Sequence, residues 1–166
     1  MSGRGPTTVE CALRDYRDSD FETLWRLDQE CFPPDLAYSR TELAGYIRRP
    51  NSVTVVAELG GKVAGYIVAE RGGRKVGHII TLDVRAQARR SGLGSKLMAA
   101  AEERLRGLGC PSVLLEVAVE NAAAIAFYHR QGYVTLATIP HYYNGKTDAL
   151  LLGKKLGQER PDDSPR

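Results

Sequence analysis

Arg89-Arg90-Ser91-Gly92-Leu93-Gly94 is a glycine-bearing loop between a strand pattern and a helix pattern. Residues 77–84 before it are apolar and β-branched, which predicts a strand. After it, apolar residues recur at helical spacing as far as position 108, which predicts a helix that begins at Gly92 or Leu93. This order directs several backbone N–H groups, and the positive end of the helix dipole, at one point. The segment therefore predicts a phosphate-binding loop in which Gly92 and Gly94 leave room for the anion to reach the amides.

Two common phosphate-binding loops do not match this segment. A P-loop needs a Lys-Ser or Lys-Thr pair at the end of a longer glycine loop, and this loop has none. A dinucleotide fingerprint needs a third glycine at fixed spacing and belongs at the first strand of its domain, whereas this loop is in mid-chain. Taken alone, the hexapeptide is explained equally well by a glycine turn that starts a helix. The neighbouring segments must therefore distinguish a phosphate-binding loop from a simple glycine turn.

The composition is that of one globular domain with its own core. The chain has 166 residues, of which 43% are hydrophobic and 26% are charged. A net charge of +3 does not indicate nucleic-acid binding, because a few basic residues around a phosphate site account for it. The cysteines (Cys11, Cys31 and Cys110) are odd in number and lack the spacing of a metal site, and we find no signal peptide or membrane-spanning segment. We expect reduced thiols, no metal, no membrane and a cytoplasmic location.

The hydrophobic pattern predicts a domain over residues 9–156 with polar tails at 1–8 and 157–166. Strands are expected at residues 9–13, 53–59, 62–70, 77–84, 113–119, 133–139 and 149–155. Helices are expected at residues 21–30, 39–48, 93–108 and 121–131. Capping residues mark three helix starts: Asp18 or Ser19 for the first, the box from Ser39 to Glu42 for the second, and Asn121 for the last.

This order, together with Arg-x-x-Gly-x-Gly after a strand, resembles the GNAT superfamily of acetyl-coenzyme A-dependent N-acetyltransferases. Residues 116–121, 124–128 and 132–133 are similar to the family's second conserved region. Residues 142–145 with 148–150, and Cys31-Phe32-Pro33, resemble a narrower group, the protein N-terminal acetyltransferases and especially the bacterial ribosomal-protein alanine N-acetyltransferases. The resemblance implies a single α/β (α+β) domain. It has a mixed, mostly antiparallel sheet of about seven strands, about four helices, and a splayed parallel strand pair at the cofactor site.

The resemblance also implies acetyl-coenzyme A as cosubstrate and assigns residues to it. The backbone of the strand pairs with the pantetheine arm and the thioester oxygen at Leu82, Asp83 and Val84. The diphosphate is met by the side chains of Arg89 and Arg90 and by the backbone of Ser91, Gly92, Leu93, Gly94 and Ser95. Asn121 is expected to cap a helix and to contact pantetheine, although a cap alone explains it as well.

Glu116 is the sharpest anomaly in the sequence, because it lies in an otherwise apolar strand between Leu115 and Val117. On strand alternation it shares a face with Leu114 and Ala118. Burial would raise its pKa toward the working pH, which suits a general base. The resemblance assigns it that role, directly or through a water. A structural carboxylate paired with an arginine or with a residue at a strand end is the alternative.

Tyr128 follows Ile125 and Phe127 on the helix that Asn121 caps. A phenol here could protonate a departing thiolate, and the resemblance assigns it that role. A core aromatic residue with a satisfied hydroxyl is the alternative. His78 could relay a proton from the neighbouring strand, but a lone strand histidine is more often structural, so we leave it out of the catalytic set.

The acceptor site is expected between two aromatic segments, formed by Tyr142 and Tyr143 and by Phe32, Pro33 and Tyr38. Hairpin aromatics beside a type I′ turn at Asn144-Gly145 are the alternative for the first pair. The expected reaction is acetyl transfer to a protein or peptide N-terminal α-amine, a ribosomal protein being one candidate, by direct attack in a ternary complex. A lysine or small-molecule acetyltransferase, and a non-catalytic acyl-coenzyme A sensor, stay open as alternatives. We expect a monomer or weak dimer.

Overall fold

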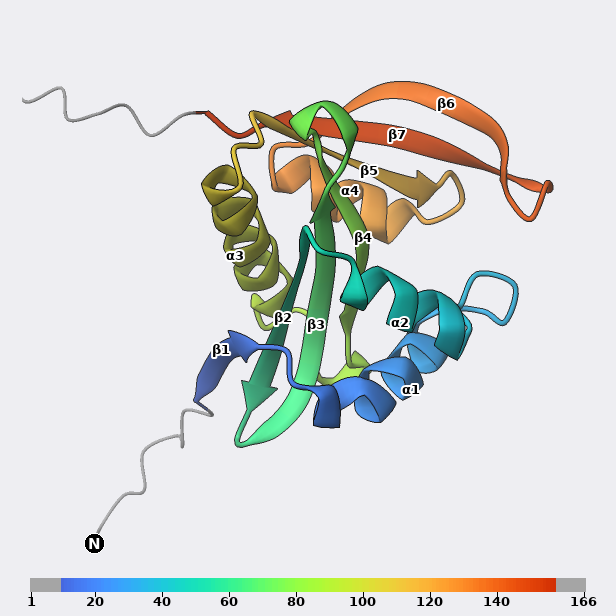
Figure 1. Ribbon diagram of the computed structural model, residues 1–166. Helices are drawn as coiled ribbons and strands as arrows, with labels where there is room; N and C mark the ends of the chain where they lie inside the picture. The colour runs from blue at the N-terminus through green and yellow to red at the C-terminus, as the bar shows by residue number, and fades with distance from the viewer. Residues whose placement is uncertain (1–9, 158–166) are drawn as a thin grey trace, which may run out of the picture.

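A seven-stranded mixed sheet runs through the molecule in the order β1-β2-β3-β4-β5-β7-β6 (Figure 1). The computed structural model describes residues 10–157, so the predicted tail 1–8, Val9 and residues 158–166 of the second tail lie outside the described part. The strands are β1 (Cys11–Asp15), β2 (Ser52–Leu59), β3 (Lys62–Arg71), β4 (Gly77–Val84), β5 (Ser112–Ala118), β6 (Val134–Tyr143) and β7 (Thr147–Lys155). The predicted fold class and element order are confirmed.

Helices cover both faces of this sheet, and each face has its own hydrophobic core. The helices are α1 (Phe21–Cys31), α2 (Arg40–Arg48), α3 (Leu93–Gly107) and α4 (Ala122–Arg130). On one face, α1 and α2 pack their apolar side chains against β2 and β3. On the other face, α3 and α4 pack against the central strands. Figure 1 shows α3 on the opposite side of β2–β4 from α1 and α2. No helix within residues 10–157 is long and apolar enough to cross a membrane.

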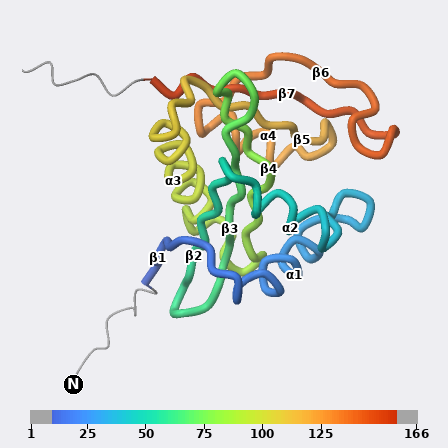
Figure 2. The backbone as a smooth tube through the Cα atoms, viewed as in Figure 1, coloured from blue at the N-terminus to red at the C-terminus, as the bar shows by residue number. Residues whose placement is uncertain are grey.

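The only parallel strand pair among the described residues, β4 with β5, is joined over two residue pairs. Gly77 pairs with Val113 and His78 pairs with Leu114. A Cβ on Gly77 would lie 2.9 Å from Leu105 Cδ1, so glycine allows this close start. Beyond it, β4 stays paired with β3 while β5 pairs with β7, and the two strands run apart (Figure 2). The predicted splayed pair is therefore present.

A β-bulge in β4 lies just beyond this short ladder. The register against β3 moves from Ala69–Ile79 to Val68–Thr81, which leaves Ile80 without a partner. An extra residue shifts the alternation of side chains along the strand. Ile80 accordingly packs with the α1 and α2 core, whereas Leu82 and Val84 pack with the α3 core. The bulge thus turns the last residues of β4 toward the phosphate loop.

The helix starts confirm two of the predicted caps and correct one. Ser39 accepts a hydrogen bond from Glu42 N in a complete capping box, and Asn121 Oδ1 accepts one from Ala124 N at 3.1 Å. A short 3₁₀ turn at Asp18–Asp20 precedes α1, and the N-cap position is Asp20 rather than Asp18 or Ser19. The sequence pattern did not distinguish this turn from the α-helix because both place polar residues at the start.

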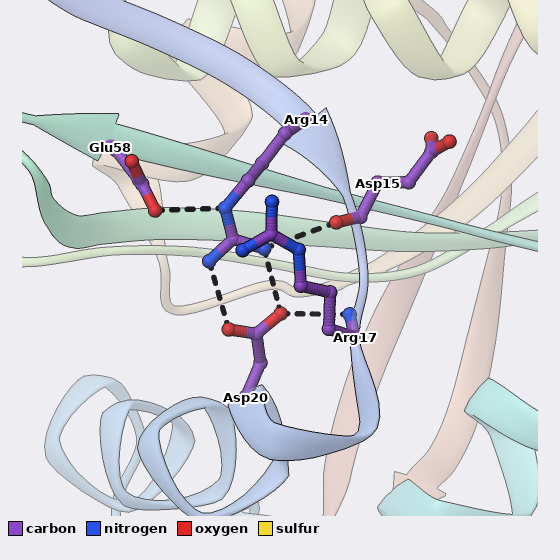
Figure 3. A network of polar contacts seen from close by, with 5 residues as sticks. All are labelled: Arg14, Asp15, Arg17, Asp20 and Glu58. Carbon is purple, nitrogen blue, oxygen red and sulfur yellow. Dashed lines mark hydrogen bonds and ion pairs between the residues drawn. The ribbon is translucent and has the colours of Figure 1, made fainter.

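Asp20 does not cap α1 with its side chain, because its carboxylate is held by a guanidinium instead. Both of its oxygens accept hydrogen bonds from Arg14 at 2.8 Å, and one also accepts from Arg17 N (Figure 3). Arg14 Nε donates to Glu58 on β2 at 2.8 Å. These bonds lower the pKa of Asp20 and raise that of Arg14. The network fastens the entry of α1 to the first two strands.

Three strands differ from their predicted bounds by two residues or more: β1, β6, and β7, which begins at Thr147 rather than at residue 149. β1 lies at Cys11–Asp15, two residues beyond the end of the predicted strand, because it pairs with β2 as far as Asp15–Val55. β6 continues through Tyr143, so Tyr142 and Tyr143 lie in the strand rather than in the turn. The turn itself is as predicted: Asn144 and Gly145 have φ values of 52° and 68°, the left-handed pair that a type I′ turn requires.

Candidate active site

Glu116 and His78 form a close polar pair where β4 and β5 begin to diverge. Glu116 Oε2 lies 2.6 Å from His78 Nε2. His78 belongs to the last pair of the parallel ladder, and Glu116 lies two residues beyond its partner Leu114. The exposed fractions of the two side chains are 32% for His78 and 18% for Glu116. A carboxylate and an imidazole in hydrogen-bond contact, with access to solvent, can take up and pass on a proton.

The environment of Glu116 differs in part from the sequence-based expectation. The alternation is confirmed, since Leu114, Glu116 and Ala118 are half-buried while Val113, Leu115 and Val117 are buried. Glu116 is nevertheless not an isolated carboxylate in an apolar core, because His78 accompanies it. If Glu116 were a purely structural carboxylate, the sequence predicted an arginine or a strand-end residue as its partner. The partner in the structure is instead His78, on the neighbouring strand. The pair lines a hollow of about 210 Å³ together with Gly72, Gly73 and Val76 of the turn before β4, and with Gly77 and Leu114.

Tyr142 and Tyr143 lie beside this pair. Their rings meet edge to face with centroids 4.8 Å apart. Burial, and then the negative charge of Glu116, raise the pKa of both hydroxyls. The structure therefore brings these predicted acceptor-site residues to the proposed base.

The loop between α1 and α2 forms a second aromatic segment near the same pair. Tyr38 packs against Tyr46 with ring centroids 5.4 Å apart, and its hydroxyl donates to the carbonyl of Ile80, the bulge residue, at 3.3 Å. Burial raises the pKa of Tyr38, and Tyr142 and Tyr143 add to the shift. The side chain of Asn144 donates to the carbonyl of Asp35, which joins this loop to the β6–β7 turn. Phe32 and Pro33 lie at the start of the loop, half-buried and exposed respectively.

Tyr128 on α4 is half-buried between Phe127 and Tyr133, at ring-centroid distances of 5.2 Å and 6.0 Å. Burial raises its pKa, and the charges of Asp83 and Tyr143 raise it further. The hydroxyl therefore keeps its proton through the neutral range. Tyr128 therefore lies near Asp83 at the end of β4 and near Tyr143 at the end of β6, both of which influence its pKa.

The phosphate loop has the conformation that the sequence predicts, but its glycines are explained differently. Gly92 has φ +82° at the N-cap of α3, and a Cβ there would meet nothing within 4 Å. A Cβ on Gly94 would lie 3.2 Å from the ring of Phe127. Gly92 is thus required by backbone conformation, and Gly94 by the approach of α4. The first N–H groups of α3 have no acceptor within the helix and are available to an anion.

The remaining predicted cofactor residues surround this helix start. Arg89 donates to the carbonyl of Val84 at 3.1 Å, so its side chain lies along the end of β4. Arg90 has φ +65° and is exposed. Gln131 from the end of α4 donates to Ser95 Oγ at 2.8 Å. Leu82, Asp83 and Val84 form the end of β4 beyond the point where β5 leaves it.

Two residues of the site were missed or set aside at the level of sequence. His78 was excluded as a lone strand histidine, although its position on the strand just before the phosphate loop could have placed it opposite Glu116. Tyr46 was not considered, because helix periodicity alone marks it as one more aromatic residue of α2. Within the described residues, no group of three or more His, Cys, Asp or Glu side chains could hold a metal ion.

Comparisons with known proteins identify the family of this chain. The family model described as acetyltransferase (GNAT) family matches residues 21–133. An uncharacterized N-acetyltransferase of Methanocaldococcus jannaschii is 31% identical over 86% of this chain and 90% of its own length. An N-alpha-acetyltransferase of Sulfurisphaera tokodaii is 28% identical over 89% of this chain and 94% of its own.

Solved structures show the same fold. Ard1 from Thermoplasma volcanium is similar with a TM-score of 0.82 at 28% identity, over 89% of this chain and 99% of that one. The ribosomal-protein alanine N-acetyltransferase of Escherichia coli has a TM-score of 0.79 at 19% identity, over 95% and 99%, and so shares the fold. With a family model that spans most of the domain, and an archaeal relative that matches along nearly its whole length, the chain belongs to the acetyltransferase (GNAT) family.

Proposed function

We propose that this protein transfers an acetyl group from acetyl-coenzyme A to the N-terminal α-amine of a protein or peptide, by direct attack in a ternary complex. The observation that carries the proposal is the Glu116–His78 pair, at 2.6 Å, beside the tyrosines of β6. Membership of the GNAT family supports acetyl transfer. The relative named N-alpha-acetyltransferase supports an α-amine as acceptor.

The phosphate loop fits the diphosphate of acetyl-coenzyme A. The N–H groups at the start of α3 and the positive end of its dipole would meet the anion, and Gly92 leaves its approach open. Arg89 and Arg90 would add charge-assisted hydrogen bonds. Because β5 has left β4 at Leu82–Val84, backbone groups of these residues are proposed to hold the pantetheine arm and the thioester. Asn121 at the start of α4 is proposed to contact that arm as well as to cap the helix.

Glu116 is proposed as the general base, with His78 as its partner. An α-amine has a pKa of about 8 and loses its proton with modest help, whereas a lysine near 10.4 needs more. Glu116 would take the proton from the ammonium form, and His78 would pass it toward the hollow lined by the turn before β4. The neutral amine then attacks the thioester carbonyl carbon.

Tyr128 is proposed as the general acid that completes the proton balance. The tetrahedral adduct formed by this attack carries one more proton on nitrogen than the amide product. When the carbon–sulfur bond breaks, the electron pair stays on sulfur and the phenol gives its proton to that thiolate, while the proton lost by the nitrogen balances the one that restores the phenol. A raised pKa keeps the phenol protonated until that moment. Phe32, Pro33 and Tyr38 on one side, and Tyr142 and Tyr143 on the other, are proposed to hold the first residues of the acceptor.

The test is acetylation of a peptide library varied at its first two residues, with thiol release and mass-spectrometric location of the acetyl group. Peptides that begin with the N-terminal sequences of ribosomal proteins belong in this library. We expect acetyl on α-amines. Glu116→Gln should lower kcat by about 10²- to 10⁴-fold, the range for removal of a general base. Glu120→Gln is the matched control, because Glu120 is exposed just beyond the end of β5.

Each alternative function predicts a different outcome of the same assay. Acetylation of lysine side chains or small amines, with α-amines inert, would identify the broader acetyltransferase class. Cofactor binding without thiol release for any acceptor would identify a sensor. Either result would overturn the α-amine proposal.

A further inference from the structure

Two carboxyl groups are buried together between α1 and β4, outside the Glu116–His78 pair. Asp28 and Asp83 are both 0% exposed, and they lie close enough for each carboxyl to shift the pKa of the other. Neither takes part in any ion pair of the described residues. Two unpaired carboxylates side by side in a protein interior would be very costly.

The hydrogen bonds of this pair account for half of its oxygen atoms. Asp28 Oδ2 accepts from the backbone N–H of Tyr38 at 2.7 Å, and Asp83 Oδ1 accepts from Thr81 Oγ1 at 2.6 Å. The other two oxygens, Asp28 Oδ1 and Asp83 Oδ2, have no hydrogen-bond partner among the described residues, and neither does the buried hydroxyl of Tyr66, which interacts with Asp83. One proton placed between the two carboxyls supplies the donor that both lack.

We propose that Asp28 and Asp83 share one proton at neutral pH, and that the resulting bond fastens the loop between α1 and α2 to β4. Asp28 is then a positioning residue for the acceptor, which acts through Tyr38. The link to the acceptor rests on the proposed function, whereas the shared proton does not.

The groups around the pair leave the second negative charge unneutralised. Tyr66 on β3, directly opposite Asp83, Cys31 at the end of α1 and Tyr128 on α4 are neutral acids, and Glu42 on α2 is itself negative. Arg89 contacts the thiol of Cys31 at 3.7 Å and the carbonyl of Val84, and neither aspartate has an arginine or lysine among the groups that shift its pKa. Burial raises both pKa values. Repulsion by Asp28 adds to the rise for Asp83, whose pKa lies well above its usual range, whereas the interaction with Asp83 lowers the pKa of Asp28 and the charge of Glu42 raises it.

The hydrogen bond that the Tyr38 N–H donates to Asp28 is one of several that fix the position of Tyr38. The Tyr38 carbonyl accepts from Trp25 Nε1 at 3.1 Å and from Gln29 Nε2 at 2.8 Å, both on α1. The hydroxyl bonds to the bulge residue Ile80. Two of these bonds reach β4, the strand proposed to carry the thioester: the hydroxyl of Tyr38 bonds to Ile80 directly, and its N–H is linked to β4 through Asp28 and Asp83. A displacement of Asp28 would therefore move the acceptor wall relative to the cofactor.

The shared proton can be counted without an activity assay. Carbon-13 resonances of the aspartate carboxyls, recorded against pH, should show one carboxyl that stays protonated at neutral pH, and that signal should vanish in Asp28→Asn, whose amide replaces the shared proton. The proposal of a shared proton would be overturned if Asp28 and Asp83 were both ionised at neutral pH.

The positioning role is tested by a conservative and a disruptive substitution. Asp28→Asn keeps an acceptor for the Tyr38 N–H and offers an N–H to Asp83, so its KM for peptide should stay close to that of the wild type. Asp28→Ala loses the bond and should raise the peptide KM by about tenfold or more, with the KM for acetyl-coenzyme A unchanged. Glu30→Gln, an exposed carboxylate on the same helix, is the control.

The pH dependence separates positioning from simple folding. Ionisation of the second carboxyl should loosen the loop, so the peptide KM of the wild type should rise relative to that of Asp28→Asn as the pH increases. If Asp28→Ala does not fold, the ratio of the peptide KM of the wild type to that of Asp28→Asn still tests the positioning role. An equal peptide KM in Asp28→Ala, or a ratio that does not change with pH, would overturn the positioning role. If the wild type acetylates no α-amine, the proposed function fails. The carbon-13 measurement still shows whether Asp28 and Asp83 share a proton.

Discussion

Gly94 in the first turn of α3 lies so close to Phe127 on α4 that a Cβ there would be 3.2 Å from the ring. The contact joins the helix that starts at the phosphate loop to the helix that carries Tyr128. The glycine therefore sets the distance between the proposed diphosphate site and the proposed acid.

Gly94→Ala should separate these two helices and weaken cofactor binding. We expect the Kd for coenzyme A to rise by about tenfold, because a methyl group forced into a packed contact costs about 1–3 kcal/mol. Gly107→Ala is the matched control on the same helix, where a Cβ would meet nothing within 4 Å. It should leave binding unchanged and stabilise the fold by up to about 1 kcal/mol. Titration calorimetry and thermal unfolding measure both effects; equal Kd values for the two variants would contradict this account.

His78 and Glu116 should act as one unit in catalysis. We expect His78→Gln to lower kcat by about tenfold or more. The double variant with Glu116→Gln should be scarcely slower than Glu116→Gln alone, because the effects of substitutions in residues that act together do not add. The measurement is kcat with a peptide acceptor at saturating acetyl-coenzyme A. Fully multiplicative losses would mean that the two residues act independently.

Tyr128→Phe should lower kcat by about 10²- to 10⁴-fold with little change in either KM, because it removes only the proposed acid. Tyr133→Phe is the matched control. Its hydroxyl donates to Glu102 at 3.2 Å in the core, so its loss should lower stability and not kcat. Since burial keeps the Tyr128 pKa above its usual value, the wild-type rate should not decline through ionisation of this group at neutral pH. Normal turnover by Tyr128→Phe would exclude the acid role.

Asp20→Asn should destabilise the fold in a pH-dependent way. Arg14 lowers the pKa of Asp20, so the carboxylate contributes stability above its unfolded pKa of about 4, and this contribution is lost as the pH falls through the lower folded pKa. We expect a loss of about 2 kcal/mol at neutral pH, the range for hydrogen bonds to charged groups. The loss should shrink toward zero in acid. Asp18→Asn, exposed in the same turn, is the control, and urea unfolding across pH is the measurement. A loss that does not vary with pH would contradict the linkage.

The order of elements could be predicted from the sequence because each carries a local signal. The period of apolar residues indicated strands and helices, and Gly60-Gly61 and Asn144-Gly145 marked the hairpins. The extension of β6 to Tyr143 could not be predicted, since it depends on pairing with Thr147 across the turn. The Asp20 carboxylate likewise bonds to Arg14 instead of capping α1, and Arg14 is held by Glu58 on β2, which is distant in sequence.

The candidate site was predictable at positions where a residue type differs from that of its sequence neighbours. Glu116 among apolar residues and the glycines before α3 are such positions. The parts that were missed depend on which strands are neighbours. His78 gains its partner because β4 and β5 are parallel and paired at that residue, and Asp28 meets Asp83 because α1 crosses the end of β4. No spacing along the chain contains this information.

The two separate cores have a consequence for how new specificities can arise. Leu24, Leu43 and Tyr66 belong to the core under the loop proposed to bind the acceptor, whereas Leu97, Met98 and Leu105 belong to the core behind the loop proposed to bind the diphosphate. Substitutions that reshape one core leave the packing of the other intact. Mutation and selection can therefore exchange the molecule that receives the acetyl group while the donor is kept, and directed evolution toward new acceptors should begin in the α1 and α2 layer.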